Sequence, residues 1–255
     1  MQSVTLPWLS EDSPLPAPTL AWGPGTPAPG LLAAGGDLTI PRLLEAYGQG
    51  TFPWYSEGQP VLWWCTQPRM VLSTQDFRLH RSLRKTLQRF RVSPGCEVRF
   101  DSAFDQVIEQ CAHVGRAGQG GTWIVPDMID AYQALHRAGN AHSVETWIEG
   151  ELVGGLYLVA LGQAVFGESM FSCRTDASKI ALAALVAWAR HHGIDWIDCQ
   201  QQTPHLASLG AKPMALEPFL QQVARARELP SPPWKFSPVY WNTLLPIAAP
   251  QPTAA

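Results

Sequence analysis

The chain has 255 residues, of which 46% are hydrophobic and 15% charged, and its formal net charge is −3 at pH 7. This length and apolar content can bury a sizeable core in one large or two modest domains. The small negative charge excludes a generally basic protein that coats RNA, so any nucleic-acid contact must come from a local patch.

The sequence indicates a soluble cytoplasmic protein without a metal site. No apolar stretch approaches the roughly 20 residues that cross a bilayer, and residues 1–14 lack the basic and apolar regions of a signal peptide. The five cysteines are scattered, with no CxxC pair and no spacing typical of metal ligands. We therefore expect reduced thiols and no bound metal.

Residues 1–68 predict a small N-terminal domain. Seven prolines within residues 1–30 indicate an irregular arm. A short helix that ends in glycine is predicted within residues 38–50, and an aromatic loop follows at 52–64.

Residues 69–255 predict a larger domain that opens with a strand at 69–74. Alternating and periodic apolar residues then predict further elements in chain order. These are helices at 77–91, 103–113 and 127–137, strands at 144–150, 151–162 and 163–171 with tight turns at Gly150 and Gly162, a helix at 177–192 with one apolar side, and a strand at 194–200. A proline-rich tail begins near Leu229. The fold class is therefore α+β, with a mixed, mainly antiparallel sheet.

The helix predicted at 77–91 has a leucine seam and a cationic face. Leu79, Leu83 and Leu87 recur every four residues, as expected of the side that packs inward. The opposite side carries the candidate phosphate contacts Arg78, Arg81, Arg84 and Lys85. An ordinary solvated helix face is the simpler interpretation of the same pattern.

Acidic residues lie at the ends of two predicted strands that flank the helix at 177–192. Because side chains alternate along a strand, Asp198 and Gln200 should share one face and touch, with Cys199 on the other face. Glu168 lies on the preceding strand. A carboxylate beside an amide, opposite a second carboxylate, could orient an incoming amine. Carboxylates satisfied within the core are the alternative interpretation.

Three segments carry a resemblance to a known family. Residues 52–72 (FPWYSEGQPVLWWCTQPRMVL), 151–172 (ELVGGLYLVALGQAVFGESMFS) and 197–211 (IDCQQQTPHLASLGA) resemble the bacterial leucyl/phenylalanyl-tRNA protein transferases, in that family's order. The resemblance spans roughly Gly35 to Pro213. It implies an acetyltransferase-like larger domain that moves Leu, Phe or Met from aminoacyl-tRNA to the α-amine of proteins beginning with Arg or Lys, marking them for degradation. We expect no cofactor and a monomer.

The resemblance also implies roles for single residues. Asp198 and Gln200 would form a catalytic relay, and Glu168 would face the positive N-terminal residue of the acceptor. The residues implied around the 3′ adenosine and the acceptor channel are Tyr47, Trp54, Trp123 and Tyr132. The walls implied for the amino-acid pocket are Leu156, Val165, Met170, Leu185 and Ile197. The family pattern has Met at the first of these walls and Phe at the second and fourth, so we expect a wider pocket here.

Three other functions compete with this one. The acetyltransferase-like fold suggests an acyl-CoA-dependent N-acetyltransferase, but the turn SCRTDAS at 172–178 lacks the glycines that cradle the CoA pyrophosphate, and the glycine-rich segment 118–121 precedes the strands. Cys199 could be a nucleophile with His205 and Asp198, although a buried structural cysteine is the simpler interpretation. A tRNA-binding module without catalysis is the third alternative.

Overall fold

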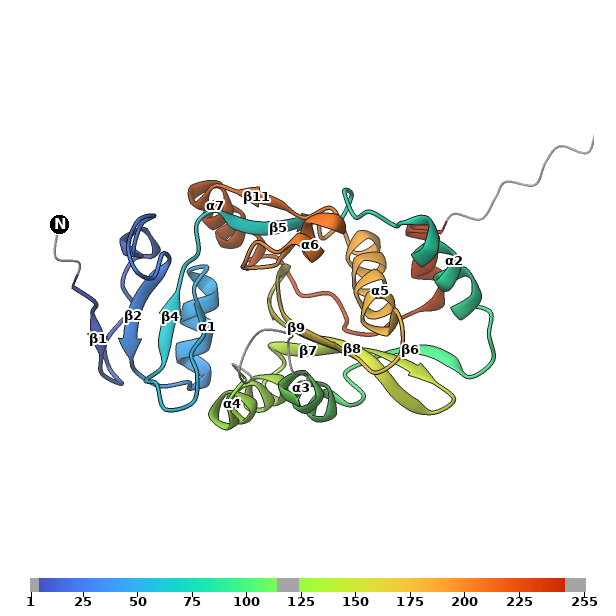
Figure 1. Cartoon of the computed structure of the whole chain (residues 1–255), viewed down its shortest axis with the longest axis horizontal. Helices are drawn as coiled ribbons and strands as arrows, with labels where there is room; N and C mark the ends of the chain where they lie inside the picture. Colours follow the sequence, from blue (N-terminus) through green and yellow to red (C-terminus); the bar gives the residue numbers. More distant parts are fainter. Residues whose placement is uncertain (1–4, 114–123, 246–255) are drawn as a thin grey trace, which may run out of the picture.

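The computed structural model describes residues 5–113 and 124–245 and has two β-sheets with helices around them. Figure 1 shows the smaller sheet at the N-terminal end of the long axis and the larger sheet in the remainder of the molecule. The fold is α+β, as the sequence predicts.

The smaller sheet has four strands in the order β1-β2-β4-β3. These are β1 (Trp8–Leu9), β2 (Leu31–Gly35), β3 (Phe52–Pro53) and β4 (Leu62–Trp64). Helix α1 (Ile40–Gly48) follows β2 and has a proline in its first turn, where the missing N–H costs no hydrogen bond. It buries Leu43, Ala46 and Tyr47, so its apolar side forms part of the core.

The larger sheet has seven strands in the order β11-β5-β10-β9-β8-β7-β6. These are β5 (Arg69–Ser73), β6 (Cys96–Phe100), β7 (Ala141–Ile148), β8 (Glu151–Leu161), β9 (Ala164–Ser172), β10 (Trp196–Asp198) and β11 (Lys212–Met214). Among the described strands of this sheet, β9 and β10 are the one pair that runs parallel. Both predicted turns are present, since Gly150 and Gly162 have φ of 80° and 57°.

Helices cover both faces of the larger sheet (Figure 1). On one face lie α3 (Phe104–His113) and α4 (Pro126–Arg137), and on the other lies α5 (Ala177–His191). Because α5 connects the parallel strands β9 and β10, the order is an antiparallel meander, a helix and a strand, as expected for an acetyltransferase-like domain. The remaining helices are α2 (Arg81–Phe90), α6 (Pro204–Ser208), α7 (Leu216–Ala226) and the 3₁₀ helices Pro18–Leu20 and Pro238–Thr243.

Helix α5 differs from the one-sided helix that the sequence predicts. Every residue from Ile180 to Ala189 is buried. The C-terminal segment covers the side that would otherwise face solvent, and Trp188 Nε1 donates a hydrogen bond of 3.1 Å to the Pro233 carbonyl. A helix enclosed on all sides has no polar face to reveal its orientation.

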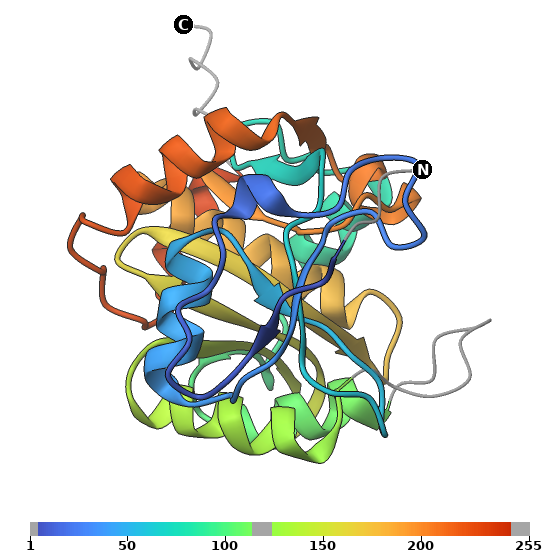
Figure 2. The ribbon, with the colours of Figure 1, turned by 90° about the vertical axis from the view of Figure 1, so that its left-hand side faces the viewer.

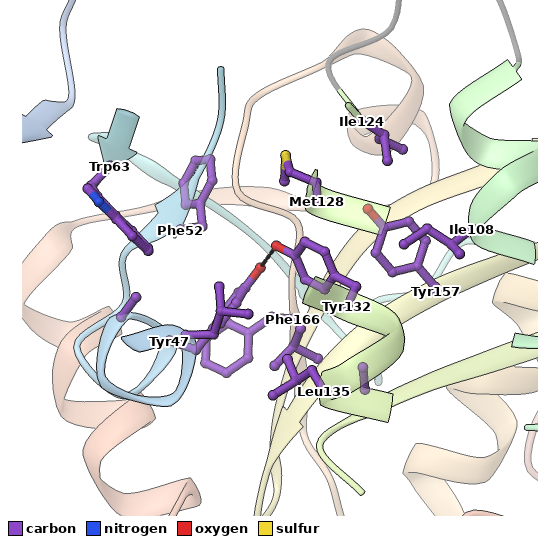
Figure 3. Close-up of a cluster of buried hydrophobic side chains, with 14 of the residues drawn as sticks. Tyr47, Phe52, Trp63, Ile108, Ile124, Met128, Tyr132, Leu135, Tyr157 and Phe166 are labelled. Carbon is purple, nitrogen blue, oxygen red and sulfur yellow. Dashed lines mark hydrogen bonds between the residues drawn. The ribbon is translucent and has the colours of Figure 1, made fainter. Parts of the chain in front are cut away.

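A shared hydrophobic cluster joins the two sheets. Its members include Trp63 from β4, Tyr47 from α1 and Phe166 from β9. Figure 3 shows the Tyr47 hydroxyl meeting that of Tyr132 on α4, at 2.5 Å. Figure 2 shows α1, in light blue, beside the green α4. The boundary at residue 68 stays a prediction, although the smaller sheet ends at Trp64 and β5 begins at Arg69.

Several elements were not predicted from the sequence. They are β6, β11, α6, α7, the two 3₁₀ helices and all four strands of the smaller sheet, of which β3 and β4 lie in the segment 52–64 that was predicted to be a loop. The short edge strand β11 has only three residues and includes a proline, which is too little for a period-two pattern. Strand β10 ends two residues earlier than predicted, at Asp198, and this difference determines the geometry of the site.

Candidate active site

A mostly apolar pocket of about 460 Å³ lies between β8, β9, α5, the end of β10 and α6. Its apolar lining includes Phe52, Trp54, Leu156, Met170, Leu182, Leu185, Ile197 and Leu206. Its polar lining includes Glu168, Ser169, Gln200, Gln201, Thr203 and His205. An apolar pocket with a few grouped polar side chains is the usual form of a site for a small organic group.

Glu168 reaches the pocket because of a β-bulge. In the β8–β9 pairing, Tyr157 is opposite Ser169 and Leu158 is opposite Gly167, so Glu168 has no partner on β8. A bulge of this kind inserts one residue, bends the strand and redirects the side chain. Glu168 is only 9% exposed and contributes the pocket's carboxylate.

Gln200 lies just beyond the end of β10, in the left-handed conformation with φ of 57°. The parallel register puts Asp198 opposite Phe166, which brings the residues two positions further on, Gln200 and Glu168, side by side. Gln200 Nε2 donates a hydrogen bond of 2.6 Å to Glu168 Oε1. Glu168 Oε2 has no hydrogen-bond partner among the described residues.

The expectation that the Asp198 and Gln200 side chains touch is wrong. Asp198 is fully buried and does not line the pocket, and its Oδ1 accepts instead from the Gln200 backbone N–H at 2.9 Å. The alternation predicted for a strand stops where Gln200 turns left-handed. Consequently Cys199, expected on the opposite face, lines the same pocket as Gln200.

Asp198 is held by Arg69, a residue that the sequence analysis did not select. Arg69 Nε and Nη2 donate to the two Asp198 carboxylate oxygens at 2.8 and 2.7 Å, and both side chains are completely buried. The guanidinium also lies between the rings of Phe52 and Phe219, 4.8 and 4.7 Å from their centroids. The only sequence signal was a basic residue inside a buried strand.

The surroundings of Glu168 favour its neutral form. Burial raises the pKa of Glu168 to about 8, and the nearby Asp198 charge adds to the rise, while Tyr47, Arg69 and Gln200 oppose it. Burial also raises the pKa of the Tyr47 and Tyr132 hydroxyls, and the Glu168 charge adds to both shifts. Glu168 is therefore mostly protonated at pH 7 in the free protein.

Three of the four aromatic residues implied for substrate contact lie in the described part of the chain, and one of these three lines the pocket. Trp54 is half-buried, its ring centroid lies 5.3 Å from that of Trp64, and it borders both the main pocket and an adjoining polar one. Tyr47 and Tyr132 are completely buried and do not reach the pocket surface, so no base could stack on them. Trp123 and the glycine-rich segment 118–121 lie outside the described residues.

Four of the five predicted walls line the pocket, namely Leu156, Met170, Leu185 and Ile197. The expectation that Val165 is a wall is not met. Val165 is completely buried in the same hydrophobic cluster, and it packs there without lining the pocket. Sequence reasoning missed Leu182, one turn before Leu185 on α5, and Phe52, which the chain brings from the other sheet.

Cys199 and His205 are poor candidates for nucleophilic catalysis. Burial raises the pKa of the Cys199 thiol to about 12, and the Asp198 charge adds to this rise, so the thiolate is scarce at neutral pH. Burial also lowers the pKa of His205, on α6 at the exposed rim of the pocket. No hydrogen bond between the two side chains is recorded among the described residues.

The predicted basic helix is confirmed as α2, although it begins at Arg81. Arg78 precedes the helix and is exposed, as are Arg81, Arg84 and Lys85. Leu83 and Leu87 are buried and Leu79 is half-buried. The leucine seam therefore packs inward and the cationic side chains face solvent.

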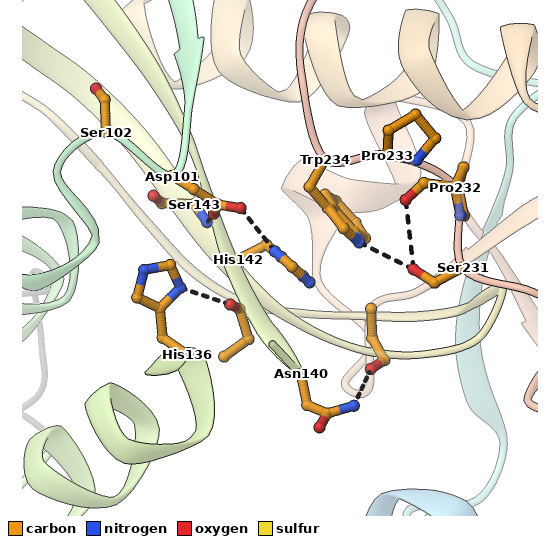
Figure 4. A network of polar contacts seen from close by, with 12 residues as sticks. Asp101, Ser102, His136, Asn140, His142, Ser143, Ser231, Pro232, Pro233 and Trp234 are labelled. Atoms are coloured by element: carbon orange, nitrogen blue, oxygen red, sulfur yellow. Dashed lines mark hydrogen bonds and ion pairs between the residues drawn. The ribbon is translucent and has the colours of Figure 1, made fainter. Parts of the chain in front are cut away.

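One group among the described residues, Asp101, His136 and His142, brings three possible metal-ligand atoms within 4.8 Å of one another. Figure 4 shows a hydrogen bond of 2.8 Å between Asp101 Oδ2 and His142 Nδ1. Two ligands of a tetrahedral zinc ion lie about 3.3 Å apart, so this distance fits a hydrogen bond better. The His142 ring stacks on Trp234 at 3.9 Å, and we interpret the pair as an anchor for the C-terminal segment.

Comparison with known proteins identifies the family. The model of the leucyl/phenylalanyl-tRNA protein transferase family matches residues 71–224, and that of the family's N-terminal domain matches residues 36–67. This chain is 60% identical to a protein of Polaromonas sp. (strain JS666 / ATCC BAA-500) named leucyl/phenylalanyl-tRNA–protein transferase, over 94% of both chains. It is also 60% identical to a protein of the same name from Leptothrix cholodnii, over 94% of this chain and 95% of the relative. The chain belongs to this family of transferases.

Solved structures of other proteins show weaker similarity. FemX has a TM-score of 0.44 with 12% identity, covering 72% of this chain and 71% of its own. A GCN5-related N-acetyltransferase from Kribbella flavida has a TM-score of 0.31 with 10% identity, covering 67% and 59%. Within the described residues, none of the helices combines the length and apolar character needed to cross a membrane.

Removing Arg69 should destabilise the protein strongly. Arg69→Met leaves the buried Asp198 carboxylate without a counter-charge, and breaking such a pair costs about 3 to 5 kcal/mol. Unfolding in urea should reveal this loss. Arg174→Met is the matched control, because it breaks an ion pair with Glu151 whose side chains are 46% and 69% exposed, and it should change stability little. An equally small loss for Arg69→Met would contradict this account of the pair.

Replacing Glu168 should change how stability depends on pH. Because its pKa is higher in the folded than in the unfolded protein, the wild type should lose stability as pH rises from the unfolded value near 4.5 to about 8. Glu168→Gln removes this loss. The variant's stability relative to wild type should therefore rise by at least about 2 kcal/mol between pH 5 and pH 8.5, measured by urea unfolding. A pH-independent difference would mean that Glu168 is ionised throughout.

Proposed function

We propose that this protein transfers Leu, Phe or Met from aminoacyl-tRNA to the α-amine of proteins that begin with Arg or Lys, which marks those proteins for degradation. The observation that carries the proposal is the hydrogen-bonded pair of Glu168 and Gln200 at one apolar pocket, in a chain of this family. An apolar pocket suits the donor side chain, and a carboxylate suits a cationic acceptor.

The donor side chain occupies the apolar part of the pocket in this proposal. Leu156, Met170, Leu185 and Ile197 line this part, and all four are flexible or branched aliphatic side chains without polar atoms to satisfy. Apolar burial there contributes about 25 cal/mol per Å². Trp54, on the border with the polar pocket, is the candidate platform for the terminal adenosine, because base stacking accepts any tRNA body.

The exposed cations Arg78, Arg81, Arg84 and Lys85 are the candidate contacts to tRNA phosphates. In a chain with net charge −3 they form a local basic patch, and phosphate binding needs such a patch rather than a basic protein. No ion pair with a carboxylate is recorded for these four side chains in the described part of the chain, which leaves their charge available.

The reaction needs positioning more than strong acid or base catalysis. An aminoacyl ester is activated, so holding the amine against its carbonyl supplies most of the rate. We propose that Gln200 orients the amine and that Asp198 acts through the Gln200 backbone, with Glu168 facing the acceptor's cationic end. No cofactor is required, and we propose that the enzyme acts as a monomer in the cytoplasm, where charged tRNA is made.

The alternative functions have less support. For an acyl-CoA-dependent enzyme, the turn between β9 and α5 holds Asp176 in the left-handed conformation where a glycine would ease pyrophosphate binding. Thiol catalysis is opposed by the raised pKa of Cys199. A binding module without catalysis would have no use for a hydrogen-bonded Glu168 and Gln200 at the pocket.

Amino-acid transfer is the direct test of the proposed function. With leucyl-tRNA as donor, a protein that begins with Arg should become labelled, whereas the same protein beginning with Ala should not, because the proposed acceptor carries a positive charge on its first side chain. The measurement is incorporation of radiolabelled Leu. Labelling of neither protein, with an active donor, would refute the proposal.

The basic patch predicts a separable defect. Arg81→Gln with Arg84→Gln should raise KM for charged tRNA and reduce its salt dependence, because about two phosphate contacts are lost. A minimal aminoacyl-adenosine donor should react as before. Arg225→Gln with Arg227→Gln, on and just after α7, is the matched charge control. Equal loss with both donors would show that α2 does not bind tRNA.

A further inference from the structure

The acceptor must lose a proton before it can attack. An α-amino group has a pKa near 8, so most of it is ammonium at pH 7. Asp198 is badly placed to take this proton, because both of its oxygens are held by Arg69 and it does not reach the pocket. The carboxylate that the relay mechanism requires is therefore already neutralised inside the protein.

Among the described residues, the pocket lining contains one carboxyl group, that of Glu168. Glu168 Oε1 accepts a hydrogen bond from Gln200 Nε2. The side chain is more than nine-tenths buried, and Oε2 is enclosed within the protein. His205, the competing base, is on the exposed rim, and Cys199 keeps its proton.

We propose that Glu168 is the catalytic base, that its carboxylate takes a proton from the acceptor's α-ammonium group, and that Arg69 and Asp198 are positioning residues for Gln200. This inference rests on the proposed function, and it reassigns the chemical step from Asp198 to Glu168. The β-bulge is the local device that directs the carboxyl group into the pocket.

The electrostatics of the site suit this role. A pKa of about 8 for Glu168 is close to that of the amine, so proton transfer between them is nearly balanced in free energy. A cation within about 4 to 6 Å favours the carboxylate, so an arriving positive N-terminus promotes ionisation of Glu168. The Glu168 carboxyl group is thus neutral in the empty site and ionised when the acceptor binds.

The proton balance of the step is complete. Glu168 accepts one proton from the ammonium, and the free amine forms a C–N bond to the ester carbonyl. As the C–O bond to the ribose breaks, the second proton leaves nitrogen for the ribose oxygen. Glu168 released its own proton when the acceptor bound and ends the turnover neutral again, so that a neutral amide, a free ribose hydroxyl and one released proton result.

The role as a base can be separated from a role in recognition by changing only the acceptor's nucleophile. One peptide begins with Arg, and its twin carries an aminooxy group in place of the α-amine, which is neutral at pH 7 and needs no base. With saturating leucyl-tRNA at pH 7, Glu168→Gln should slow single-turnover transfer to the amine peptide by about tenfold, because only about a tenth of an amine with a pKa near 8 is neutral there without a base. Transfer to the aminooxy peptide should change by less than about twofold.

Three further variants complete the comparison. Asp198→Asn should slow both peptides alike, because misplacing Gln200 affects either nucleophile. His205→Gln should not slow transfer to one peptide more than to the other. Glu151→Gln, which changes an exposed carboxylate, should leave both transfer rates unchanged. If Glu168→Gln slows transfer to both peptides equally, the proposal is overturned and Glu168 acts in recognition. If His205→Gln slows transfer to the amine peptide alone, His205 is the base. Failure of the wild type to modify the amine peptide would instead refute the proposed function.

A measurement on the wild type covers the case in which Glu168→Gln does not fold. Transfer to the amine peptide should rise between about pH 6 and pH 9, because the pair formed by the amine and Glu168 must lose one proton before the amine can attack. Transfer to the aminooxy peptide should stay level over this range. A parallel rise for the aminooxy peptide would overturn the proposal, since a neutral nucleophile would then still depend on the ionised carboxylate.

Discussion

The buried ion pair between Arg69 and Asp198 is the interaction on which the site depends. It joins β5 to β10 through two hydrogen bonds in a fully buried position, where removing either partner would leave an isolated charge. The rings of Phe52 from the smaller sheet and Phe219 from α7 enclose the guanidinium. Three parts of the chain far apart in sequence therefore meet at one charge.

The same carboxylate shapes the pocket. Asp198 Oδ1 accepts the Gln200 N–H, which stabilises a left-handed conformation that costs about 1 to 2 kcal/mol for a residue with a side chain. The Gln200 carbonyl in turn accepts from Thr66 Oγ1 at 3.0 Å. The Gln200 amide is fixed in this way against Glu168, so a charge outside the pocket sets the direction of a polar group within it.

The division of tasks between the two carboxylates follows from their environments. Asp198 is fully buried, has a guanidinium partner and supports structure, whereas Glu168 lines the pocket, has an amide partner and a raised pKa. Two acidic residues with opposite solvation and pairing commonly take different roles at an active site. The apolar walls contribute to this difference because they exclude water from the unpaired oxygen.

The sequence by itself determined the long elements: the meander of β7, β8 and β9 with its glycine turns, helix α5, and the basic and apolar sides of α2. It also indicated Glu168, Asp198 and Gln200 and four of the pocket walls, because strand ends and family resemblance are local properties. It could not give the Arg69 partner of Asp198, the bulge at Glu168 or the left-handed turn at Gln200. Those depend on pairing between strands distant in sequence and on a charge whose partner lies 129 positions away, and only the tertiary structure brings such groups together.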